Sequence, residues 1–84
     1  MQITIQLLAT YRRYLPPADD RPGCTPDGYP RTIAPGTTVG EVLADLPLGP
    51  SELYTFLVNG RHAERQQLLQ TGDLLTVFPP AGGG

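Results

Sequence analysis

The end of the chain constrains the fold most, because a β-strand pattern runs directly into a segment that no sheet can hold. Residues 74–78 are β-prone, and a Pro-Pro-Ala spacer and three glycines follow them to the last residue. Proline has no N–H to donate to a neighbouring strand, so strand pairing ends there. Glycine has no side chain to pack and loses much conformational freedom when it is ordered. The sequence therefore predicts one domain over residues 1–78 and a flexible arm over residues 79–84.

A thin arm of this kind fits into a narrow channel that side chains would block. Its tip is the Gly84 carboxylate, with Gly83 beside it. We hypothesise that this carboxylate is the reactive group and that the domain presents it. Terminal glycines also occur as a frayed end or as a cloning remnant. Here the spacer joins them directly to a strand, and from the residues alone both interpretations stay open.

Length and charge exclude several classes of protein. The chain has 84 residues, which is enough for one small core and no second domain. A net charge of −2 gives no footprint for nucleic acid or an anionic membrane. All six basic residues are arginine, so no lysine side chain is offered as an isopeptide acceptor. No apolar run approaches the roughly 20 residues that cross a bilayer, and Met1 leads straight into a strand pattern instead of a signal peptide.

The chain has one cysteine, Cys24, and one histidine, His62. A lone cysteine forms no intrachain disulfide, which fits a reducing cytoplasm, where we expect the protein to be located. A catalytic thiol needs a basic partner, and a metal site needs several ligands. We therefore interpret Cys24 as a passive loop thiol and His62 as a solvent-side turn residue. We expect no bound metal or cofactor and no independent enzymatic activity.

The first half of the chain predicts two strands and an unusually long connection. Residues 2–8 alternate between apolar and polar, which indicates a half-buried strand. Residues 10–28 are rich in proline and glycine and predict a long loop with a short helical turn over residues 11–15. Residues 29–34 predict a second, antiparallel strand, with Tyr29, Thr32 or Ile33 facing the core and Pro30 favouring a sheet edge.

Residues 38–46 give the clearest helix pattern. Thr38 and Glu41 have the spacing of a capping box. An apolar stripe follows at helical spacing: Val39, Val42, Leu43 and Leu46. Pro47 ends the segment. This stripe predicts a helix that covers one face of the sheet.

The second half predicts a hairpin and a final strand. Residues 54–58 are β-prone and lead into Asn59-Gly60, a strong hairpin turn signal, with a return strand over residues 62–64. Residues 66–70 predict one helical turn that buries Leu68 or Leu69. In the final strand Leu75 and Val77 share one face, which leaves Phe78 on the other.

Phe78 has two interpretations. An aromatic side chain on the open face of the sheet, beside a flexible arm, indicates a docking surface, which we favour. Alternatively Phe78 packs against Leu8 or Leu57 as part of the core.

Together these elements predict an α+β fold of the β-grasp (ubiquitin-like) type. The sheet is expected to be mixed, with four to five strands and one main helix packed on one face. The first and last strands are expected to lie parallel at its centre.

Several segments resemble one family. The ending over residues 77–84 closely resembles the tail of the molybdopterin synthase small subunit, a member of the MoaD/ThiS group of ubiquitin-like sulfur carriers. Residues 58–60 resemble the family's mid-chain turn, and residues 69–73 resemble the start of its last strand. Residues 8–12 place Arg12 where the family often has arginine. Gly82 and the long segment over residues 16–30 depart from the family pattern.

The resemblance implies a function for the arm. A ubiquitin-activating-like adenylyltransferase would use ATP and magnesium to adenylate Gly84. A sulfur donor protein would then displace AMP and leave a terminal thiocarboxylate. The large subunit of molybdopterin synthase, or another sulfur acceptor enzyme, would receive the arm. The residues implied in partner contact are Phe78, Pro79, Pro80, Gly82 and Arg12.

Other users of the same arm stay open. They include thiamine thiazole synthesis, cysteine synthesis, tungsten-cofactor assembly and conjugation to a protein lysine. An alternative of another class is a β-grasp interaction module whose tail is never activated.

Overall fold

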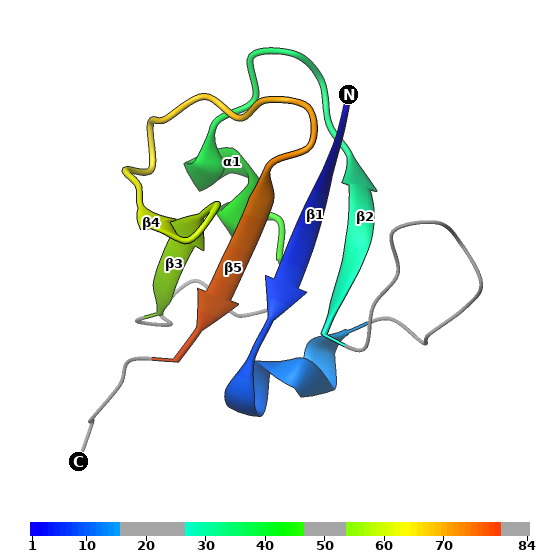
Figure 1. Ribbon diagram of the computed structural model, residues 1–84, viewed down its shortest axis with the longest axis vertical. Helices are drawn as coiled ribbons and strands as arrows, with labels where there is room; N and C mark the ends of the chain where they lie inside the picture. The colour runs from blue at the N-terminus through cyan, green and yellow to red at the C-terminus, as the bar shows by residue number, and fades with distance from the viewer. Residues whose placement is uncertain (16–26, 47–53, 80–84) are drawn as a thin grey trace.

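The computed structural model describes residues 1–15, 27–46 and 54–79 (Figure 1). These residues form a mixed sheet of five strands in the order β2-β1-β5-β3-β4. The strands are β1 (Gln2–Leu7), β2 (Gly28–Thr32), β3 (Thr55–Val58), β4 (Arg61–His62) and β5 (Leu74–Phe78). A 3₁₀ helix, η1 (Ala9–Tyr14), follows β1, and the α-helix α1 (Val39–Ala44) packs on one face of the sheet. The predicted β-grasp architecture is confirmed.

The first and last strands pair in parallel at the centre of the sheet, as predicted (Figure 1). Ile5 lies opposite Leu75, and Leu7 lies opposite Val77. All four side chains are fully buried, with 0% exposure, on the face that α1 covers. The alternation in the sequence therefore defines the core, because every second residue of both strands packs against the helix.

Helix α1 begins at the predicted cap. The Thr38 hydroxyl accepts a hydrogen bond from the Glu41 N–H at 3.3 Å. The next amides are bonded by a distant segment: Val39 donates to the Gln67 carbonyl at 2.9 Å and Gly40 to the Arg65 carbonyl at 2.7 Å. The helix thus has three of its first amides satisfied, two of them by residues near the end of the chain.

The predicted helical turn over residues 66–70 is wrong. Leu68 instead forms an isolated bridge with Thr38, and the Leu69 N–H donates to the Thr37 carbonyl at 3.0 Å. The segment stays irregular because its backbone groups bond to the start of α1 instead of to one another. Leu69 is buried, as one of the two alternatives had it, and Leu68 is 59% exposed.

The Asn59-Gly60 turn is confirmed. Both residues have positive φ, 53° and 80°, as a type I′ hairpin turn requires. This two-residue turn places Arg61 directly opposite Val58. The return strand is therefore Arg61–His62 and begins one residue earlier than predicted.

At the other edge, β2 carries Pro30, where its missing N–H costs no ladder bond to a further strand within the described sheet. Ile33 is buried, Tyr29 is half-buried and Thr32 is exposed. Burial raises the pKa of the Tyr29 hydroxyl, and the nearby Arg31 guanidinium partly offsets that effect. Arg31 also pairs with Asp45 at the end of α1, which ties this edge to the helix.

The predicted turn over residues 11–15 is the helix η1, which begins two residues earlier and buries Tyr11. Residues 16–26 of the long loop, which include Cys24, lie outside the described residues, as does Pro47. Within the described parts of the chain, no helix is long and apolar enough to span a membrane.

The cap of α1 gives a direct test of the helix start. Thr38→Ala removes the hydroxyl that caps the helix, so we expect the free energy of unfolding to fall by about 1 kcal/mol. Urea unfolding followed by circular dichroism measures the change. Thr38→Ser keeps the hydroxyl and should retain most of the stability. Equal losses in both variants would show that the cap contributes nothing.

Candidate functional site

The chain leaves the sheet from its centre. Phe78, the last residue of β5, lies opposite Thr55 of β3, and the preceding Val77 carbonyl accepts a hydrogen bond from the Leu8 N–H at 3.0 Å. Pro79 is the next residue, and η1 lies at the same end of the sheet, where β5 ends (Figure 1). The predicted residues Pro80, Gly82, Gly83 and Gly84 lie outside the described residues.

The face of the sheet away from α1 carries the other half of each strand's alternation. Thr76 lies on this face between Gln6 and Leu57. Its hydroxyl donates to Gln6 Oε1 at 3.0 Å, and only 7% of the residue is exposed. It is the one buried polar residue among those described, so its neighbours form a closely packed surface here without a covering helix.

Phe78 shares this open face. It is half-buried and lies outside the buried core cluster. The register places it directly across from Thr55, with Leu57 opposite Thr76. The structure therefore agrees with the surface interpretation of Phe78 better than with the core alternative, while its role in docking stays a prediction.

Arg12 is paired within the protein. Its Nε lies 3.1 Å from Asp27 Oδ1, and the two side chains are 56% and 38% exposed. The Asp27 carbonyl also accepts a hydrogen bond from the Leu7 N–H at 2.9 Å. Arg12 thus connects η1 to the residue just before β2. Sequence analysis missed Asp27 as its partner, because 15 positions separate the two residues and no local pattern joins them.

Within the described part of the chain, no group of three or more histidine, cysteine, aspartate or glutamate side chains lies close enough together to hold a metal ion. His62 is exposed on the short strand β4, as predicted for a solvent-side residue. Of the predicted site residues, Phe78 and Pro79 lie at the end of the sheet where η1, which contains Arg12, also lies. Phe78, Pro79 and Arg12 at this end of the sheet are the part of the candidate site that the described residues form.

A comparison with known protein families identifies the family of this sequence. The profile of the ThiS family matches residues 28–84. The chain belongs to the ThiS family. The match begins at β2 and runs through the whole arm, including Gly84. Membership identifies a small ubiquitin-like protein of the sulfur-carrier type, which works with activating enzymes and sulfur acceptors instead of acting as an enzyme itself. Among curated proteins, no sequence matches this ThiS family chain.

Solved structures share the fold. A putative molybdopterin converting factor, subunit 1, from Pyrococcus furiosus has a TM-score of 0.73 and 19% identity, over 95% of this chain and 98% of that one. SAMP1 from Haloferax volcanii has a TM-score of 0.68 and 21% identity, over 100% of both chains. A structure of small archaeal modifier protein 1 from H. volcanii has a TM-score of 0.67 and 20% identity, over 95% and 98%. At these identities the likeness establishes the fold.

Replacing Arg12 separates its structural role from a role in partner binding. Because the Arg12–Asp27 pair is solvent-exposed, we expect Arg12→Gln to lower the free energy of unfolding by less than about 1 kcal/mol. If Arg12 also contacts a partner, the same variant should bind that partner more weakly while it stays folded. Urea unfolding and a binding isotherm measure the two effects, with Arg13→Gln as the matched control. A stability loss above about 2 kcal/mol would mean that the pair is mainly structural.

Proposed function

We propose that this ThiS family protein carries sulfur as a thiocarboxylate at Gly84 and delivers it in molybdopterin (molybdenum or tungsten cofactor) biosynthesis, as the small subunit of the synthase. The observation that carries the proposal is the family match, which continues through residue 84. It is supported by the path of β5, which releases the chain from the centre of the sheet at Pro79. The domain then acts as a rigid holder for a narrow arm.

The chemistry follows from the weakness of a carboxylate as an electrophile. A carboxylate oxygen of Gly84 attacks the α-phosphate of ATP on the activating enzyme, and pyrophosphate leaves. The product is a mixed anhydride in which AMP is a good leaving group. The terminal sulfur of a persulfide on a sulfur donor protein then displaces AMP and forms an acyl disulfide. A thiol reductant cleaves its S–S bond, which releases the donor protein and leaves a thiocarboxylate on Gly84. Magnesium and ATP are used by the activating enzyme, and the acceptor enzyme takes the sulfur.

The arm and its surroundings have separate roles in this proposal. Gly82, Gly83 and Gly84 keep the tip narrow, since no Cβ widens it. Pro79 and Pro80 have no N–H to donate, so they cannot extend the strand pairing of β5. Phe78, on the open face beside the exit, contacts the partner enzyme that receives the arm. Arg12 lies at the same end of the sheet, and in this proposal it contacts an acidic group of that partner in addition to Asp27.

The pathway is the finest part of the proposal. The Phe-Pro-Pro sequence over residues 78–80 favours the molybdopterin branch of the family, and the P. furiosus neighbour bears the name of a molybdopterin converting factor subunit. A second candidate is a ubiquitin-like protein modifier, which the likeness to the H. volcanii modifiers favours. Both candidates activate the same carboxylate and differ in the acceptor, a precursor bound to an enzyme or a lysine of another protein.

Intact mass spectrometry tests the carrier step. We expect incubation with a ubiquitin-activating-like enzyme, ATP, magnesium and a sulfur source to raise the mass by the difference between sulfur and oxygen. Fragmentation should place the change at Gly84. A chain that lacks Gly83 and Gly84 is the control and should keep its mass. An unchanged mass for the full chain, with an enzyme that converts a known carrier, would contradict the proposal.

The same truncated chain separates the carrier from a plain interaction module. Binding through the sheet face should survive the truncation, whereas sulfur transfer should be lost. Adding a lysine-containing acceptor protein then separates the two carrier candidates. A covalent adduct through an isopeptide bond would indicate a modifier, and release of sulfur to a molybdopterin precursor would indicate the synthase subunit.

A further inference from the structure

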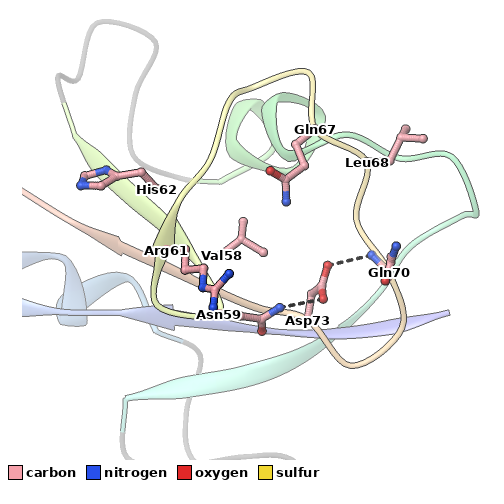
Figure 2. Close-up of a pocket in the computed structure, with 8 residues that line it drawn as sticks. All are labelled: Val58, Asn59, Arg61, His62, Gln67, Leu68, Gln70 and Asp73. Carbon is pink, nitrogen blue, oxygen red and sulfur yellow. Dashed lines mark hydrogen bonds between the residues drawn. The ribbon is translucent and has the colours of Figure 1, made fainter.

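A cavity of about 650 Å³ lies beside the start of β5 (Figure 2). It opens between the β3–β4 hairpin and the segment over residues 67–73, which leads to the start of β5. Its lining includes Val58, Asn59 and Arg61 from the hairpin, and Gln67, Leu68 and Asp73 from the segment. Val58, Gln67 and Asp73 point into the cavity (Figure 2). None of these residues takes part in the function proposed above.

Hydrogen bonds fix the lower wall of this cavity. Asn59 Nδ2 donates to Asp73 Oδ1 at 3.0 Å, and the Gln70 N–H donates to Asp73 Oδ2 at 2.8 Å (Figure 2). Asn59 Oδ1 in turn accepts from the Leu74 N–H at 2.9 Å. Both oxygens of the Asp73 carboxylate therefore have partners inside the protein. Asp73, the one acidic side chain of the lining, is therefore held in place by neutral donors.

The upper wall is fixed by the helix. The Gln67 carbonyl accepts the Val39 N–H of α1 at 2.9 Å, and the Leu69 N–H donates to the Thr37 carbonyl at 3.0 Å. The cavity is thus formed before any ligand arrives. Binding to a preformed site avoids the entropic cost of ordering its walls.

Arg61 is the unusual member of the lining. Four of the five described arginines interact with another side chain: Arg12 with Asp27, Arg13 with Tyr14, Arg31 with Asp45, and Arg65 with the rings of Tyr54 and Phe56. Arg61 is the one without such a partner in the described part of the chain. Arg61 therefore offers guanidinium donors that no side chain in the described part of the chain occupies, and a charged hydrogen bond to an anionic group would satisfy them.

Leu68 adds an apolar requirement. It is 59% exposed and is the one large hydrophobic residue exposed among those described. Its backbone bridge to Thr38 holds it on the cavity rim. Covering this side chain would be favourable, at about 25 cal/mol for each Å² of apolar surface. A ligand that fits both features carries an acidic group and an apolar group at separate points, because Arg61 and Leu68 lie on opposite sides of the cavity (Figure 2).

We propose that this cavity binds an acidic peptide segment of a partner protein, with a carboxylate on Arg61 and an apolar side chain against Leu68. Small-molecule sites are enclosed and mostly apolar, whereas this cavity is open and mostly polar. A peptide also brings N–H and C=O groups for the amide of Gln67 and the remaining acceptor capacity of Asp73. The proposal does not depend on any chemistry at Gly84.

A titration monitored by ¹⁵N–¹H NMR tests this site on the full chain. The probe is an acetylated and amidated pentapeptide of alternating glutamate and leucine, and the matched probe has glutamine in place of glutamate. We expect the acidic peptide to shift the amide signals of Asn59, Arg61, Gln67 and Asp73. The glutamine peptide should bind at least about tenfold more weakly, as the loss of a charged hydrogen bond predicts.

Protein variants complete the test. Arg61→Gln and Leu68→Ser should each weaken binding of the acidic peptide, and both replace exposed side chains, so the unperturbed part of the spectrum reports an intact fold. Arg13→Gln, outside the cavity, should bind as the unchanged protein does. Shifts that persist in Arg61→Gln, or equal binding of both peptides, would overturn the proposal. So would an absence of shifts, or inorganic phosphate giving the same shifts at equal affinity.

Discussion

The parallel pairing of β1 and β5 is the interaction on which the rest of the structure depends. It joins the two ends of the domain, so that all other elements lie within the connection between them. Ile5 and Leu75 meet at its centre and are fully buried beneath α1. Because β5 is a central strand, the arm is attached to the best-supported part of the sheet. A pull on the arm by a partner enzyme acts on a strand that is bonded on both sides.

Helix α1 depends on a segment far away in the sequence. Six residues are too few for a helix that is stable by itself in water. Here the carbonyls of Arg65 and Gln67 satisfy its first amides, and the close approach leaves little room for a side chain at Gly40, whose Cβ would lie 3.2 Å from Arg65. The same contact positions one wall of the cavity. Core, helix and cavity are therefore one connected unit instead of separate features.

The sequence was sufficient where structure follows from neighbours along the chain. Strand alternation, the Thr38 cap and the positive φ of Asn59 and Gly60 are local, and each was predicted correctly. It was insufficient where the partner is distant. The segment around Leu68 looked helical because its bonds to α1 are invisible in a local pattern. The Arg12–Asp27 pair and the cavity escaped prediction for the same reason, since both bring together residues from separate elements.

The position of the cavity matters because a carrier has to meet several enzymes through one arm. Arg61 lies level with Leu75 of β5, because both pair with Val58, and Pro79 is four residues further along the chain, roughly 13 Å away at about 3.3 Å for each residue. Charges that far apart in water are largely screened at physiological ionic strength, where the Debye length is about 8 Å. The charge of Arg61 is therefore largely screened at the point where the chain leaves the sheet. A segment bound beside Arg61 would leave the arm free to enter an active site, so that one partner could hold the carrier while another uses its terminus.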